Sequence, residues 1–101
     1  MARVIWSPQA LEDVASIRQF IAREAPRTAR AFVQRIFDTV ERLERFPLGG
    51  QIVPEVGSEL FREIRIKKYR IIYRLRDEET VEIVTVYHGS RLLDLALLRH
   101  Q

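Results

Sequence analysis

Apolar residues recur at intervals of three and four over the first half of the chain, which is the spacing of one helix face. A first stripe comprises Leu11, Val14, Ile17, Phe20 and Ile21. A second, about four turns long, comprises Ala29, Phe32, Val33, Ile36, Phe37, Val40 and Leu43. Ser7 can cap the first helix, and Pro8 and Pro26 suit first helical positions. We therefore expect helices over 8–24 and from 26 to the turn at Phe46-Pro47, joined so tightly that they form an antiparallel hairpin.

Apolar and polar residues alternate in the second half, as in strands. Strand patterns cover residues 2–6, 60–67, 69–76 and 81–88, whereas 47–59 is rich in Gly and Pro and reads as a loop. The run 81–88 is apolar on both faces, which is typical of a central strand. Strict alternation sets Val81, Ile83, Thr85 and Tyr87 against Val84, Val86 and His88.

These elements predict a single α+β domain over residues 1–101, in the order β-α-α-β-β-β-α. The helical hairpin packs on one face of a small antiparallel sheet, and the last element is a short helix in the leucine-rich tail. The other sheet face then carries basic side chains, because Arg70, Arg74 and Arg76 project on one side of their strand. Trp6 is expected to anchor strand to helix, and Tyr69 and Tyr73 to lie in the core with hydrated hydroxyls.

The composition narrows the possible chemistry. The chain has no cysteine and two histidines, His88 and His100, so we expect no metal site and no cofactor. No apolar run is long enough for a membrane helix, and the start of the chain lacks a signal-peptide pattern. We expect a cytoplasmic protein that does not associate with membranes.

Basic residues are concentrated in one segment. Residues 60–76 hold seven Lys or Arg side chains against Glu63, while the whole chain has a net charge of only +3. Such a patch favours a polyanion or an acidic protein as partner. Two alternatives are a solvated strand face and cross-strand ion pairs of Arg70 and Arg74 with Glu63 or Glu82.

The tail concentrates leucine after Ser90. Leu92, Leu93, Leu95, Leu97 and Leu98 lie within seven residues. If some of them face another surface, they bind a partner segment or a second copy of the chain; alternatively, the tail folds back on the sheet.

Seven segments, taken in order, resemble the RelE/ParE family of toxins from bacterial type II toxin–antitoxin pairs. They are Trp6-Ser7-Pro8-Gln9-Ala10-Leu11-Glu12-Asp13, Ile17 to Ala22, Pro26 with Ala29 and Phe32, Phe46-Pro47-Leu48-Gly49-Gly50, Phe61-Arg62-Glu63-Ile64, Tyr69-Arg70-Ile71-Ile72-Tyr73-Arg74, and Val86-Tyr87-His88-Gly89-Ser90-Arg91. The resemblance implies a toxin, associated with plasmid stabilisation, that a cognate antitoxin holds inactive in a hetero-oligomer. It also implies that the tail leucines bind the antitoxin.

The family has two branches, and the residues favour one of them. A RelE-like toxin cuts mRNA on the ribosome, whereas a ParE-like toxin blocks DNA gyrase. RNA cleavage needs a base, an acid and cations at the phosphate; here His88, Arg70 and Arg91 would serve. Tyr87 or Lys67 would be the second proton carrier, but Tyr87 and His88 should point to opposite faces of the sheet. We therefore expect a ParE-like, non-enzymatic toxin, with an mRNA endoribonuclease as the alternative. The expected target-binding surface is Arg62, Arg65, Lys67, Arg70, Arg74, His88 and Arg91.

Overall fold

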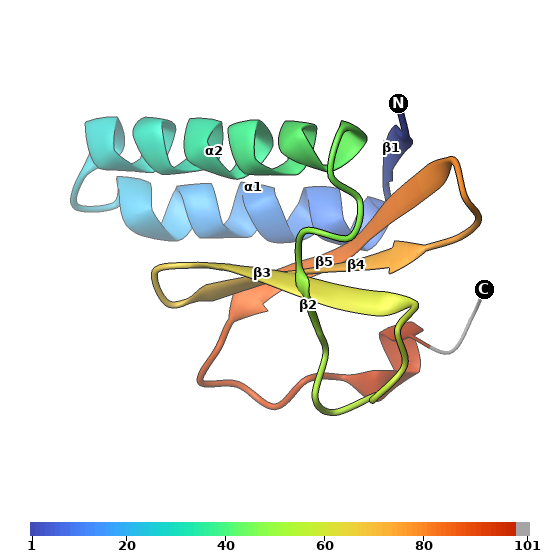
Figure 1. Cartoon of the computed structure of the whole chain (residues 1–101). Helices are drawn as coiled ribbons and strands as arrows, with labels where there is room; N and C mark the ends of the chain where they lie inside the picture. Colours follow the sequence, from blue (N-terminus) through green and yellow to red (C-terminus); the bar gives the residue numbers. More distant parts are fainter. Residues whose placement is uncertain (99–101) are drawn as a thin grey trace.

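The first half of the protein is a short strand followed by a helical hairpin (Figure 1). The computed structural model describes residues 1–98, so His100 lies outside the described residues. Helix α1 spans Pro8–Ala22 and helix α2 spans Pro26–Glu41, which a 3-10 turn, η1 (Arg42–Glu44), extends. The Ser7 hydroxyl accepts the Ala10 N–H at 3.0 Å and donates to the Val84 carbonyl at 2.7 Å. The predicted cap is confirmed, and it also ties α1 to the sheet.

The second half completes a five-stranded sheet in the order β1-β5-β4-β3-β2. Its strands are β1 (Arg3–Trp6), β2 (Gln51–Ile52), β3 (Phe61–Ile66), β4 (Tyr69–Leu75) and β5 (Thr80–His88). Strand β5 lies inside the sheet, as its two apolar faces predicted, but it pairs with β1 in parallel. The sheet is therefore mixed rather than wholly antiparallel. The two-residue β2 was not predicted, because so short a strand leaves no alternation in the sequence.

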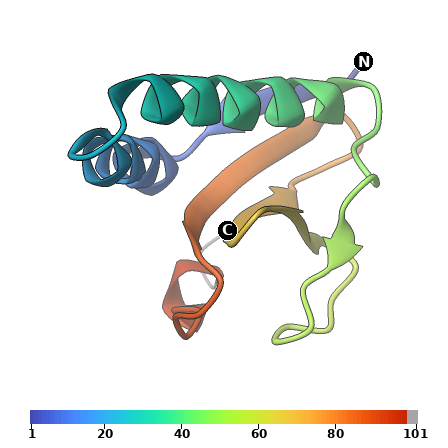
Figure 2. The ribbon, with the colours of Figure 1, turned by 90° about the vertical axis from the view of Figure 1, so that its left-hand side faces the viewer.

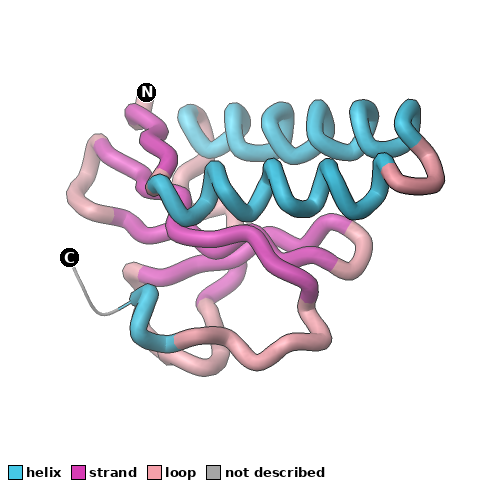
Figure 3. Tube along the Cα trace, turned by 180° about the vertical axis from the view of Figure 1, so that it is seen from behind, coloured by secondary structure: helices cyan, strands magenta, loops and turns pink. Residues whose placement is uncertain are grey.

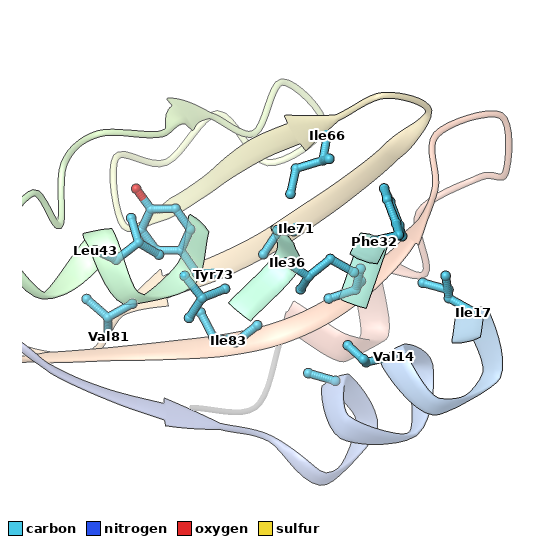
Figure 4. Close-up of a cluster of buried hydrophobic side chains, with 13 residues drawn as sticks. Val14, Ile17, Phe32, Ile36, Leu43, Ile66, Ile71, Tyr73, Val81 and Ile83 are labelled. Atoms are coloured by element: carbon cyan, nitrogen blue, oxygen red, sulfur yellow. The ribbon is translucent and has the colours of Figure 1, made fainter. Parts of the chain in front are cut away.

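The hairpin covers one face of the sheet, which we call the helix face, and the main core lies between the two layers (Figure 4). Val14 of α1, Ile36 of α2 and Ile71 of β4 meet there. The Trp6 and Phe37 rings pack together with 5.0 Å between their centroids, which confirms that Trp6 anchors β1 to α2. Leu11 and Phe20 do not follow the predicted apolar stripe, because they lie at its margins and remain exposed.

Tyr73 is a second departure from the prediction. Its side chain is 0% exposed, and its hydroxyl donates to the Pro47 carbonyl and accepts the Gly50 N–H, both at 2.8 Å. The phenol is therefore bonded to the loop after η1 rather than to water. Burial raises its pKa, so it stays protonated and holds both bonds.

The other face of the sheet, which we call the second face, is covered as well (Figure 2). Val53 of the loop after β2 and Leu98 of the tail are buried against Phe61, Ile72 and Val84. The last described element is a 3-10 helix, η2 (Leu95–Leu98). The tail thus folds back on the sheet, which was one of the two arrangements considered from the sequence.

A β-bulge in β5 shifts its side chains between the two faces. Ile72 pairs with Thr85 but Tyr73 pairs with Ile83, so Val84 is the extra residue. Strict alternation consequently fails beyond it: Val86 joins the helix-face core, and Tyr87 packs with the cluster of the second face. No helix within residues 1–98 has the length and apolar composition to cross a membrane.

Tyr73→Phe tests the buried phenol. The substitution leaves the Gly50 N–H without its partner, and we expect it to lower the free energy of unfolding by about 1–3 kcal/mol in urea denaturation. Tyr69→Phe, whose half-buried ring has no such pair of bonds, is the matched control and should change it by about 0.5 kcal/mol or less. Equal losses in the two variants would contradict this role.

Candidate functional site

Arg70, at the centre of the predicted basic face, is buried in an ionic network. Only 3% of the residue is exposed. Its Nε donates to Glu63, its two terminal nitrogens donate to both carboxylate oxygens of Glu55 at 2.7 and 2.9 Å, and Nη1 also donates to the Tyr87 hydroxyl at 2.5 Å. Two carboxylates thus neutralise this guanidinium, and the fork geometry joins the loop after β2 to strands β3, β4 and β5.

Arg74, four residues further along β4, is also buried and paired with a carboxylate. Its Nη2 donates to Glu82 of β5 at 3.1 Å, and Arg76 lies 3.9 Å from the same carboxylate. The expectation of an open sheet face carrying Arg70 and Arg74 is therefore wrong. The cross-strand alternative with Glu63 and Glu82 is confirmed, since burying a guanidinium requires a paired carboxylate.

Arg62 supports the loop after η1. Its guanidinium donates to the carbonyls of Glu59, at 3.1 Å, and Gly50, at 3.1 Å. Arg62 belongs to β3, and its bonds join this strand to the segments that precede β2 and β3. It is placed as a structural residue, apart from the remaining predicted site residues.

The other four predicted residues, Arg65, Lys67, His88 and Arg91, come together at one end of the sheet. Lys67 lies in the β3–β4 turn, while His88 ends β5. The Gly89 N–H donates to the Lys68 carbonyl at 2.6 Å, which joins the two segments. A Cβ at Gly89 would lie 3.3 Å from the Arg65 guanidinium, so glycine permits this close approach.

A groove of about 570 Å³ opens at this end, between α1 and the end of β5. Phe20 and Arg23 line its α1 wall, and Tyr69, His88 and Arg91 line the opposite side. The sequence pattern assigned only core packing to the hairpin and missed this wall. The sequence feature that could have indicated the groove is Phe20 at the margin of the apolar stripe, with Arg23 about one turn later.

His88 faces the groove in a defined hydrogen-bonded state. Its Nδ1 accepts the Ser90 N–H at 3.1 Å, with the Ser90 hydroxyl 2.7 Å away. A backbone amide only donates, so Nδ1 is the acceptor in this contact. The His88 ring packs edge-on against the Tyr69 ring, with 5.3 Å between the ring centroids. The contact with Ser90 thus occupies Nδ1 of the ring.

The neighbouring acidic and phenolic groups are engaged as well. The Asp13 carboxylate accepts from Thr85 at 2.5 Å, from the Val86 N–H at 3.0 Å and from Gln9 at 2.8 Å. Burial raises the pKa of Tyr87, so its hydroxyl stays protonated beside Arg70. No three His, Asp or Glu side chains cluster like metal ligands within residues 1–98.

The tail leucines are divided between fold and surface. Leu98 is buried, and Leu93 and Leu97 are half-buried against the second face. Leu92 is 98% exposed and Leu95 is also exposed. Only these two of the five point away from the chain's own core.

Comparison with known proteins gives one family. Residues 4–93 match the family model described as the ParE toxin of the type II toxin–antitoxin system parDE. A curated relative, Toxin RelE2 of Caulobacter vibrioides, is 30% identical over 92 residues, which cover 91% of this chain and 100% of that protein.

Two solved structures share the fold. One, described as the chromosomal ParDE toxin–antitoxin system from P. aeruginosa, has a TM-score of 0.73 at 19% identity and covers 87% of this chain and 96% of that chain. The other, the toxin–antitoxin complex RelBE2 from Mycobacterium tuberculosis, has a TM-score of 0.59 at 26% identity, covering 89% and 93%.

The Arg70 network should make stability depend on acid. Hydrogen bonds from Arg70 lower the pKa of Glu55 from 4.5 to about 2. A depressed pKa in the folded state stabilises the protein above pH 4.5, and this contribution is lost as the pH falls towards 2. We expect the melting temperature of Glu55→Gln to fall less steeply over this window than that of the wild type. Glu59→Gln, in the same loop, should follow the wild type; a Glu55→Gln profile parallel to both would contradict the coupling.

Proposed function

Because the chain belongs to the ParE toxin family of type II toxin–antitoxin systems, we propose that it inhibits DNA gyrase by binding, and that a cognate antitoxin neutralises it. The observation that carries this proposal is the state of His88. Because Nδ1 accepts the Ser90 N–H, this nitrogen is not free to act as a base. A surface of donors and cations can hold a macromolecule, but lacks the proton acceptor that attack by an RNA 2′-hydroxyl requires.

The distribution of arginines supports the same proposal. A nuclease needs cations around the scissile phosphate, yet Arg70 and Arg74 are committed to Glu55, Glu63 and Glu82. Arg65, Lys67, His88 and Arg91 remain as the target-binding surface. They lie together at the end of the sheet, beside the groove.

The alternative, a ribosome-dependent mRNA endoribonuclease, is favoured by one finding. The 30% identical relative is a toxin named RelE2. In that case His88 would have to release Ser90 to act as a base, with Arg91 and Arg65 at the phosphate.

We propose that the antitoxin covers the exposed part of the tail. Leu92 and Leu95 are apolar and exposed, and Leu92 directly follows the basic residue Arg91. An antitoxin segment that combines apolar and acidic residues would match both features.

The two activities should be measured side by side with purified toxin. We expect inhibition of gyrase supercoiling and intact ribosome-bound mRNA. His88→Ala should weaken gyrase inhibition by less than about tenfold, because one peripheral contact contributes little. Loss of a catalytic base would instead cost about 10²–10⁴-fold. Codon-specific mRNA cleavage that His88→Ala abolishes, with gyrase unaffected, would overturn the proposal.

Leu92→Asp tests the antitoxin contact. Since Leu92 is almost fully exposed, the variant should keep its free energy of unfolding within about 0.5 kcal/mol and should bind the cognate antitoxin at least about tenfold more weakly in calorimetry. Leu48→Asp, an exposed leucine in the loop after η1, serves as the control and should bind normally. Unchanged antitoxin affinity in Leu92→Asp would remove the tail from the interface.

A further inference from the structure

Unpaired cations gather at the same end of the molecule from three separate segments. Arg23 and Arg27 flank the hairpin tip, Arg65, Lys67 and Lys68 surround the β3–β4 turn, and Arg91 follows β5. The hairpin tip, the β3–β4 turn and the end of β5 lie on one side of the molecule in two opposite views (Figures 1 and 3). We call these six residues the basic end.

The charges of the basic end are free for a partner. Within residues 1–98, no ion pair engages five of the six, and Arg65 lies a long 4.0 Å from Glu63, which already binds Arg70. Of the nearby carboxylates, Asp13 is bonded to Thr85 and Val86, Glu55 and Glu63 are bonded to Arg70, and Glu24 lies at the hairpin tip. The basic end thus carries a strong uncompensated positive charge.

The opposite end of the molecule carries an acidic turn. The β4–β5 turn contains Asp77, Glu78 and Glu79, and lies at the far side from the hairpin tip (Figure 1). A cluster of cations at one end, with an acidic turn at the other, orients the chain in the field of a polyanion before contact. This asymmetry selects which surface of the toxin meets the partner.

The composition of the basic end fits a phosphate backbone better than a protein. Lysine is depleted in protein–protein interfaces, whereas DNA interfaces are much more positively charged. Single strands are held by rows of exposed aromatic rings. Here the Tyr69 ring is enclosed between Phe32 and His88, at 5.3 Å from each, and Phe20 is the one strongly exposed ring among the described residues of this end.

We propose that the basic end binds the phosphate backbone of duplex DNA. The inference rests on the proposed function for the source of that DNA, which is the segment that gyrase holds. The contacts are ionic and independent of base sequence, because cations on three separate segments reach phosphates rather than base edges. Arg23 and Arg91 line the groove together with His88, so a backbone bound by these two arginines lies next to this histidine.

The test is fluorescence anisotropy with a labelled duplex of about 20 base pairs, without gyrase, over a series of salt concentrations. Wild-type toxin should bind, with affinity that falls steeply with salt. The double variant Lys67→Gln/Lys68→Gln should lose about tenfold in affinity and reduce the salt slope by about 1.8, since each phosphate contact contributes about 0.9. Both lysines are exposed in a turn, so the fold is retained. Arg42→Gln/Arg45→Gln, with the same charge change at the other end of α2, should bind as the wild type does.

Three results would overturn the inference: no binding at low salt, an equal loss in the two double variants, or tighter binding to single-stranded RNA of the same length. A parallel supercoiling assay separates this inference from the proposed function. A toxin that inhibits gyrase without binding DNA refutes only the DNA contact. A toxin that binds DNA without inhibiting gyrase refutes only the proposed gyrase inhibition.

Discussion

The buried guanidinium of Arg70 is the interaction on which the arrangement of the molecule depends. It joins Glu55 of the loop after β2 to Glu63 of β3 and Tyr87 of β5, and so fastens the cover of the second face to three strands. Breaking a buried pair by removing one partner costs about 3–5 kcal/mol, because an uncompensated charge stays behind. The sheet is consequently covered on both sides.

This constraint separates arginines that look alike in the sequence. Arg70 and Arg74 are buried and paired with carboxylates of neighbouring strands, Glu63 and Glu82. Arg65, near the end of β3, and Arg91, after β5, are exposed instead. At the same end of the sheet, His88 is bonded through Nδ1 to Ser90.

The sequence predicts the layers of the fold well and the surface less well. The helical stripes, the Ser7 cap and the central position of β5 follow from local periodicity, which each segment carries by itself. The bulge at Val84 leaves no mark in the pattern, and it moves Tyr87 to the face of Arg70. Covering of the second face depends on where the loop at Val53 and the tail at Leu98 settle, and this is decided by long-range packing. One partner of Arg70 could be predicted and one could not. Glu63 lies on the adjacent strand and was predicted, whereas Glu55 comes from a loop whose position depends on long-range packing.

Hydrogen exchange of the toxin's backbone amides, alone and bound to gyrase with DNA, tests the central claim most directly. The account predicts new protection at residues 65–68 and 88–91, with exchange unchanged at 53–61 and 93–98, because the second face stays closed by the Arg70 network. Faster exchange at 53–61 and 93–98 on binding, with none of the new protection at the end of the sheet, would show that the target opens the covered face and would contradict the account.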